Sequence, residues 1–319
     1  MNVLQVDKLN TALILLSAAA AFILPFELFL FSYAVLGPLH YLTEISWLKK
    51  RDFFAPGKYN AWILLGLTLF IFTTRYLATD LRWMNPSMIA TAFFGALAMT
   101  LVRGKGYKIL TALLALAGIL LFWESSWYIL IFSLLLTTII HVLLFTATFM
   151  LFGAMKSRSR LGYLNIALLF TCAALFFIFE ADSLWNVSAY AREVYDGNFY
   201  GLNLKLAELF NLGELRYLDD VFNSRTGLSI MRLIAFAYTY HYLNWFSKTS
   251  IIGWGEASKK YWTIILPLWV ISVGLYVYDY RLGVACLYFL SMLHVLLEFP
   301  LNCVSFAGVY SGLKRKLLS

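Results

Sequence analysis

The residues of this chain best suited to chemistry are its four histidines, because each lies in a different apolar stretch long enough to cross a lipid bilayer. They are His40, His141, His241 and His294, and the sequence holds no other histidine. Neutral imidazole nitrogen is a good ligand for iron, copper and zinc, and it also binds haem iron. We therefore expect these side chains to form a metal or haem site inside the membrane.

The elements that must position the histidines are expected to be membrane-spanning helices. Hydrophobic residues make up 61% of the chain and charged residues 13%, and the mean hydropathy is +0.76. This composition predicts an all-α polytopic transmembrane helix bundle that forms a single domain over residues 1–319. Apolar stretches of bilayer length lie at 10–25, 27–48, 61–77, 87–102, 108–122, 127–153, 161–180, 227–247, 261–278 and 283–304. About ten spans result, or about nine if the first two are one helix; we divide them at Pro25, Phe26 and Glu27.

Basic residues indicate the orientation of the bundle. They gather in segments between alternate spans, such as KKR, RGKGYK and KSRSR. Positive charge marks the cytoplasmic side, so we expect a multi-pass protein of the bacterial inner membrane with both termini in the cytoplasm. The net charge of +8 comes from these anchors and suits anionic lipid rather than nucleic acid, because no basic run is interleaved with aromatic residues.

One long segment, residues 181–226, is not apolar enough to cross the membrane. It mixes Trp, Tyr, Phe and Leu with charges of both signs. Its spacing predicts short amphipathic helices that form an insertion lying at the outer membrane interface. Two interpretations stay open: a folded outer loop, or a lid or access port for a lipid-like substrate.

The expected topology places all four histidines at one level of the membrane. With about ten spans, the four helices run from outside to inside, and each histidine comes about 11 to 14 residues after its helix enters, or roughly 17 to 21 Å deep. Imidazoles at one depth can converge on a single ion.

Two of the histidines have a carboxylate one helical turn later. Glu44 follows His40 and Glu298 follows His294, each at the i,i+4 spacing that places two side chains on one helix face. A metal-bound imidazole commonly gives its second N–H to a carboxylate, so we interpret both glutamates as partners of the ligands, with Asn244 as a further hydrogen-bonding partner. Alternatively, the glutamates ligate a two-metal cluster themselves, or they lie near the inner interface within reach of water.

The ligand type narrows the choice of metal. Imidazole nitrogen favours a transition metal over magnesium or calcium, which need oxygen ligands. Four imidazoles on an octahedral ion leave two positions open, which suits Fe(II) binding O2 beside an apolar substrate; haem b, copper and zinc are the alternatives. A desaturase or hydroxylase of the histidine-box type needs about twice as many histidines and is set aside.

Four short segments resemble, in the same order, the histidine motifs of the Brp/Blh family of membrane-bound carotene dioxygenases, which make retinal. They are GPLHYLTEISW, TTIIHVLLFTATF, FAYTYHYLNWFSKTS and MLHVLLEFPLN. The family carries Asp where this chain has Glu44 and Glu298. The resemblance implies an iron centre, held by the four histidines, that cleaves a conjugated double bond of an apolar carotenoid taken from the lipid bilayer, using O2.

Two other classes of function fit the same residues. In a b-type haem protein that transfers electrons, the histidines would be paired axial ligands. In a proton-coupled transporter, the histidines and glutamates would form a relay. The aromatic residues near His241 either line an apolar tunnel or pack helices together; they are Tyr238, Tyr240, Tyr242 and Trp245.

Overall fold

Helices make up the computed structural model, and no strand occurs among the residues that it describes. These are residues 1–50, 59–101, 125–179, 184–213, 217–248 and 259–317, together with single positions between these ranges. The prediction of an all-α fold is confirmed. The chain divides into two compact units: the first contains Met1–His40 and Val142–Val284, and the second contains Tyr41–His141 and Ala285–Ser319. The single membrane domain expected from the sequence stays a prediction.

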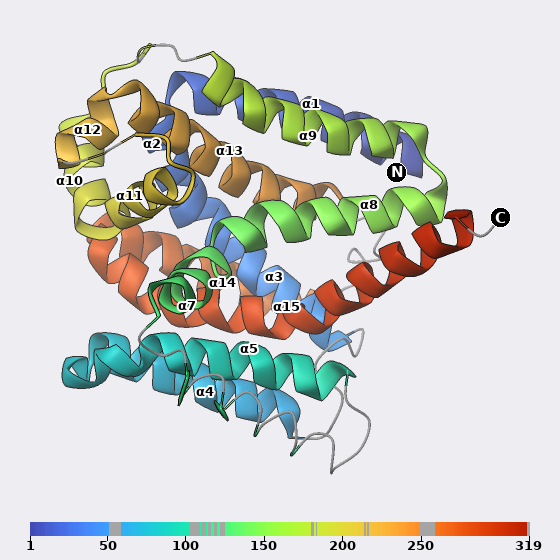
Figure 1. Ribbon diagram of the computed structural model, residues 1–319, viewed down its shortest axis with the longest axis horizontal. Helices are drawn as coiled ribbons and strands as arrows, with labels where there is room; N and C mark the ends of the chain where they lie inside the picture. The colour runs from blue at the N-terminus through green and yellow to red at the C-terminus, as the bar shows by residue number, and fades with distance from the viewer. Residues whose placement is uncertain are drawn as a thin grey trace. The chain divides into compact units, whose positions relative to one another are not determined.

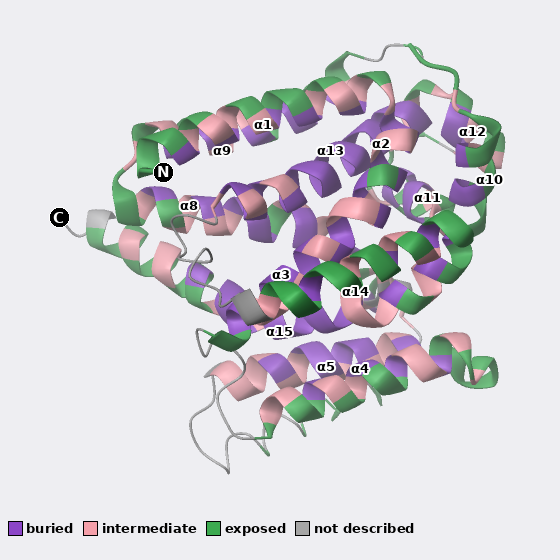
Figure 2. Ribbon diagram, turned by 180° about the vertical axis from the view of Figure 1, so that it is seen from behind, coloured by how far each residue is buried: buried purple, intermediate pink, exposed green. Residues whose placement is uncertain are grey.

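The first unit is built around α13, which is buried along nearly its whole length (Figure 2). It packs against α1, α2 and α9, and α1 and α9 run side by side (Figure 1). Leu16 of α1 and Leu164 of α9 are exposed, as suits helices that face lipid. The helices of this unit are α1 (Val3–Ile23), α2 (Pro25–Phe31), η1 (Ser32–Leu36), the start of α3 (Gly37–Lys50), α8 (Thr146–Ser157), α9 (Arg160–Ile178), α10 (Ala189–Asn198), α11 (Tyr200–Leu209), α12 (Leu218–Asn223), α13 (Arg225–Ser247) and α14 (Lys259–Tyr278).

A π-helical turn, η1, leads into the helix that carries His40. Its wider hydrogen bond runs from the N–H of Gly37 to the carbonyl of Ser32, five residues earlier. Pro38 explains this widening, because a proline ring has no N–H to donate and clashes with the carbonyl four residues before it. The helix therefore continues past Pro38, and the side chains after the π-helical turn, including that of His40, point in directions different from those in an uninterrupted α-helix.

The second unit is held by an apolar core between α4, α5 and the middle of α15. Its buried side chains include Ile71, Ile89, Phe93, Met292 and Leu296. This packing holds the part of α15 that bears His294. The helices of the unit are α3 from Tyr41 onward, α4 (Asn60–Tyr76), η2 (Thr79–Met84), α5 (Asn85–Leu101), α7 (Ser126–Leu130), η3 (Ile131–Leu135), the first residues of η4 (Ile140–Phe145) and most of α15 (Tyr280–Leu317).

The insertion at residues 181–226 contains the short helices α10, α11 and α12, as predicted. Its aromatic side chains pack on α2: the ring centroid of Phe29 lies 5.9 Å from that of Tyr195 and 4.9 Å from that of Phe199. Phe29 also contacts Tyr238 of α13, with 5.2 Å between the centroids. The Tyr195 hydroxyl donates to Asn203, and burial raises the pKa of this phenol well above its usual value, so it stays a neutral donor. The position of the insertion at the outer interface stays a prediction.

Six of the described helices are long and apolar enough to cross a membrane, which indicates an integral membrane protein. The break after Ile23 confirms the division of the first apolar stretch at Pro25. The prediction of ten spans is wrong, because α4 and α5 have only 17 residues each and α13 contains Arg225 and Arg232. The predicted span 108–122 lies mostly outside the described residues. Two of the six join elements that follow each other without a break: Pro25–Lys50 contains α2, η1 and α3, and Ile140–Ser157 contains η4 and α8. The other four are Val3–Ile23, Arg160–Ile178, Tyr261–Tyr278 and Tyr280–Arg315.

The predicted span 127–153 is interrupted by a turn at 136–138. The hydroxyls of Thr137 and Thr138 both donate to the carbonyl of Leu134, which diverts a helix acceptor. His141 therefore stands near the start of the helix Ile140–Ser157 rather than deep within one long helix. The expectation that all four histidines lie at one depth assumed that His141 comes 14 residues after the start of its helix, and the observed start at Ile140 removes that basis.

Arg232, a fully buried cation of α13, ties the end of α1 to the start of the insertion. Its guanidinium donates to the carbonyl of Phe22 over 3.2 Å and to that of Asp182 over 3.1 Å, and it lies 4.2 Å from the centroid of the Phe22 ring. The Phe22 carbonyl belongs to the last turn of α1, whose carbonyls lack helical partners and attract positive charge. Arg232 therefore closes a helix end as well as filling the core.

We expect Arg232→Met to lower the stability of the first unit by about 2 to 4 kcal/mol, because α13 loses two hydrogen bonds that a charged, buried side chain donates to backbone carbonyls. The measurement is the melting temperature of the detergent-solubilised protein. Arg225→Met is the matched control: its contact with a side-chain oxygen of Asp182, 3.3 Å away, is exposed and is worth under about 1 kcal/mol. Equal melting temperatures for the two variants would contradict the role of Arg232.

Candidate metal centre

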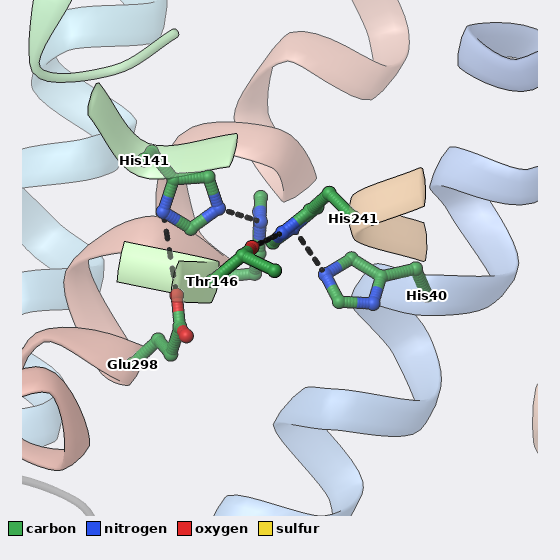
Figure 3. A network of polar contacts seen from close by, with 6 residues as sticks. His40, His141, Thr146, His241 and Glu298 are labelled. Carbon is green, nitrogen blue, oxygen red and sulfur yellow. Dashed lines mark hydrogen bonds and ion pairs between the residues drawn. The ribbon is translucent and has the colours of Figure 1, made fainter. Parts of the chain in front are cut away.

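In the first unit, His40 of α3 and His241 of α13 face each other through their Nε2 atoms, which lie 3.1 Å apart (Figure 3). The two rings meet nearly edge to face, with an angle of 74° between their planes. Both side chains are buried. This separation suits an N–H···N hydrogen bond between neutral imidazoles, and it also suits two ligands of one metal ion.

The other ring nitrogen of His241 has a partner from a third helix. Its Nδ1 lies 2.7 Å from the hydroxyl oxygen of Thr146, the first residue of α8 (Figure 3). Thr146 is itself buried. When Nδ1 carries the proton and donates it to Thr146, Nε2 is left with the lone pair that a metal ion needs.

Aromatic rings surround the first pair. Tyr242 and Trp245 of α13 pack on His40, with centroid distances of 5.2 and 5.7 Å. Tyr240, on another face of α13, donates instead to the side-chain oxygen of Asn10 over 3.1 Å. Because these aromatic side chains are buried against helices, the contacts favour the packing interpretation over the tunnel.

The second unit contains a similar pair, formed by His141 of η4 and His294 of α15. Their Nε2 atoms lie 3.2 Å apart, and the ring of Tyr41 stacks on His294 with centroids 4.1 Å apart and an angle of 25°. All four histidines of the protein are between 1% and 6% exposed. The sequence-predicted ligands therefore occur as two buried pairs, one in each unit.

Glu298 contacts a different histidine from the one its spacing indicated. Its carboxylate lies 3.3 Å from Nδ1 of His141 (Figure 3), although Glu298 follows His294 on α15. Glu44 is buried in the same unit. Its predicted role as a partner of His40 stays a prediction, and the packing of neighbouring helices decides which imidazole Glu298 reaches.

Asn244 lies on the face of α13 that contacts α1. Tyr240 and Ser247, one turn before and one turn after it, both donate to the side-chain oxygen of Asn10 over 3.1 Å. Asn244 is buried between them. Its predicted role as a partner of His241 stays a prediction.

The geometry of each pair fits metal ligation. Nitrogen ligands at about 2.0 to 2.1 Å from a tetrahedral or octahedral ion stand roughly 2.9 to 3.4 Å from one another. The separations of 3.1 and 3.2 Å fall in this range. His40 and His241 in the first unit, and His294 in the second, each offer a buried ring nitrogen that could hold a metal ion. The donor atoms favour a transition metal without selecting one.

Sequence reasoning missed Thr146 because it assumed regular α-helices. At α-helical spacing, a residue five positions after His141 is rotated by about 140° away from it. In the π-helical turn η4 each backbone hydrogen bond spans five residues instead of four, so α-helical spacing does not give the direction of the Thr146 side chain. Tyr41 was missed for a different reason: its contact with His294 depends on the packing of α15.

We expect Glu298→Gln to weaken metal binding by about 10- to 100-fold, because it replaces the carboxyl group that lies 3.3 Å from Nδ1 of His141. The measurement is the dissociation constant of Zn²⁺ in competition with a chromophoric chelator. Glu208→Gln, at an exposed position, is the control and should leave the constant unchanged. Equal constants for all three proteins would show that Glu298 does not act on a ligand.

No protein family model, no curated protein and no solved structure matches this chain. The resemblance to the Brp/Blh carotene dioxygenases therefore stays a prediction from four short motifs.

Proposed function

We propose that His40, His141, His241 and His294 hold one Fe(II) ion, and that the protein is a membrane-embedded non-haem iron oxygenase acting on an apolar polyene such as a carotenoid. One observation carries the proposal: all four histidines are buried in pairs whose Nε2 atoms face each other at ligand spacing.

Coordination chemistry supports one ion rather than one for each pair. Metal sites in proteins normally use three or four side-chain ligands, so two imidazoles alone would leave an ion under-coordinated. Four neutral imidazoles complete such a set and leave room for O2 on an octahedral ion. The buried aromatic rings around His40 would keep water away from the metal.

The pair geometry argues against the haem alternative. Axial ligands on opposite sides of one haem iron stand about 4 Å apart, twice an iron–nitrogen bond. Neither pair, at 3.1 and 3.2 Å, has that spacing. The transporter alternative calls for acidic groups at several depths, whereas Glu44 and Glu298 are both buried in one unit.

The residues of the chain have separate tasks in this proposal. When bound, iron supplies the binding and reduction of O2. Glu298, whose carboxyl oxygen lies 3.3 Å from Nδ1 of His141, would favour a proton on that nitrogen and so leave the Nε2 lone pair for the metal. The stacked ring of Tyr41 keeps the plane of His294 from turning. The apolar helices admit a lipid-soluble substrate from the side and exclude water.

We expect purified protein loaded anaerobically with Fe(II) to bind one iron per chain and to show no Soret absorption band. Alanine replacement of any one of the four histidines should remove most of the iron, because a single ion loses a ligand each time. The measurements are elemental analysis and an absorption spectrum. Two iron ions per chain, with variants of one pair leaving the other pair loaded, would contradict the single site, and a Soret band would favour haem.

The substrate is tested in bacterial cells that accumulate β-carotene. We expect expression of the chain to bleach the yellow colour and to produce an aldehyde cleavage product that chromatography identifies. The His241→Ala variant, expressed to the same level in the membrane, should leave the pigment unchanged. Iron-loaded protein that leaves β-carotene intact would remove carotene cleavage from the proposal while sparing the metal site.

A further inference from the structure

We propose that Thr146 is a positioning residue, which sets the tautomer of His241 and thereby presents the Nε2 lone pair of this imidazole to the metal. The inference rests on the proposed function and extends it to a residue that lies within the second histidine motif but that helical spacing does not single out. The supporting contact is the 2.7 Å separation of the Thr146 hydroxyl and Nδ1, with both side chains buried (Figure 3).

The helix geometry frees the Thr146 hydroxyl for this role. Other threonines of the chain turn their hydroxyls back to the carbonyl four residues earlier, as Thr68 does to Leu64 and Thr148 does to Leu144. Thr146 begins α8 directly after the π-helical turn η4, where the regular α-helical register is shifted. Its hydroxyl instead reaches across to α13.

The two directions of this hydrogen bond have opposite consequences. If His241 donates from Nδ1 to the hydroxyl oxygen, Nε2 has no proton and can ligate a metal. If the hydroxyl donates to Nδ1, the proton of the neutral ring stands on Nε2 and blocks ligation. Only the first arrangement is compatible with a metal at Nε2, so metal binding and the acceptor role of Thr146 must occur together.

The two pairs differ in the group that meets the Nδ1 atom. His141 has a carboxyl oxygen of Glu298 at 3.3 Å, whereas His241 has the Thr146 hydroxyl at 2.7 Å. A hydrogen bond to a neutral hydroxyl makes a modest net contribution to stability. Loss of the Thr146 acceptor should therefore weaken the metal site without abolishing it.

Thr146→Val and Thr146→Ser form a matched test. Valine keeps the shape of threonine but has no hydroxyl, and serine keeps the hydroxyl. We expect the valine variant to bind Zn²⁺ about 10- to 100-fold more weakly than the unaltered protein, and the serine variant to recover most of this loss. Equal affinity in all three proteins would overturn the role of Thr146, as would a loss that serine fails to recover.

A spectroscopic measurement separates this inference from the proposed function. The chain has only four histidines, so nitrogen NMR of protein labelled with ¹⁵N-histidine resolves each ring. We expect His241 to carry its proton on Nδ1 in the Zn²⁺-loaded protein, with a signal that Thr146→Val shifts and Thr146→Ser restores. A proton on Nε2, or ligation through Nδ1, would overturn the inference.

Measurements on the metal-free protein distinguish a failure of the proposed metal site from a failure of the inference about Thr146. If the unaltered protein binds neither Zn²⁺ nor Fe(II), the proposed function fails, and the tautomer of His241 is then read without metal. A proton on Nδ1 that responds to the valine variant still supports the action of Thr146, and a proton on Nε2 overturns it. If the unaltered protein binds metal but Thr146→Val changes neither the Zn²⁺ affinity nor the His241 signal, the role of Thr146 is overturned while the proposed metal site stands.

Discussion

The interaction on which the rest of the structure depends is the meeting of two imidazoles, Nε2 to Nε2, inside an apolar helix bundle. A buried polar group without a partner costs several kcal/mol in such surroundings, at roughly 2 to 7 kcal/mol by transfer estimates. His40 and His241 satisfy each other in this way, and His141 and His294 do the same. The same arrangement leaves ring nitrogens poised for a metal, so the packing requirement and the proposed function are met by one geometry.

Departures from regular helix position these rings. The π-helical turn η1 absorbs Pro38 just before His40, and η4 carries His141 directly ahead of Thr146. Such turns cost hydrogen-bond quality and are retained mostly where a side chain must be aimed. Three neighbouring side chains then restrain individual rings without ligating a metal themselves. Tyr41 stacks on His294, the Glu298 carboxyl group lies beside His141, and the Thr146 hydroxyl lies beside His241.

Much of the organisation could be predicted from local sequence, because hydropathy and residue type act over short distances. Pro25 marks the break between the first two helices, the insertion has the composition of short amphipathic helices, and the histidines stand out as isolated imidazoles in apolar runs. Predictions from the sequence failed where they depended on the exact length of a helix or on its being unbroken. Hydropathy alone counted α13 as a span although Arg232 lies in it, and it joined helices across the turn at 136–138.

The sequence by itself determined which side chains are able to ligate a metal and the apolar, all-helical surroundings, since these follow from which side chains are present and how they interact with water. Only the tertiary structure decided which imidazoles are paired, that Glu298 reaches His141 rather than His294, and that Thr146 meets His241. The physical reason is that a contact between distant residues depends on how two helices are rotated and packed against each other. No residue spacing along one helix contains that information.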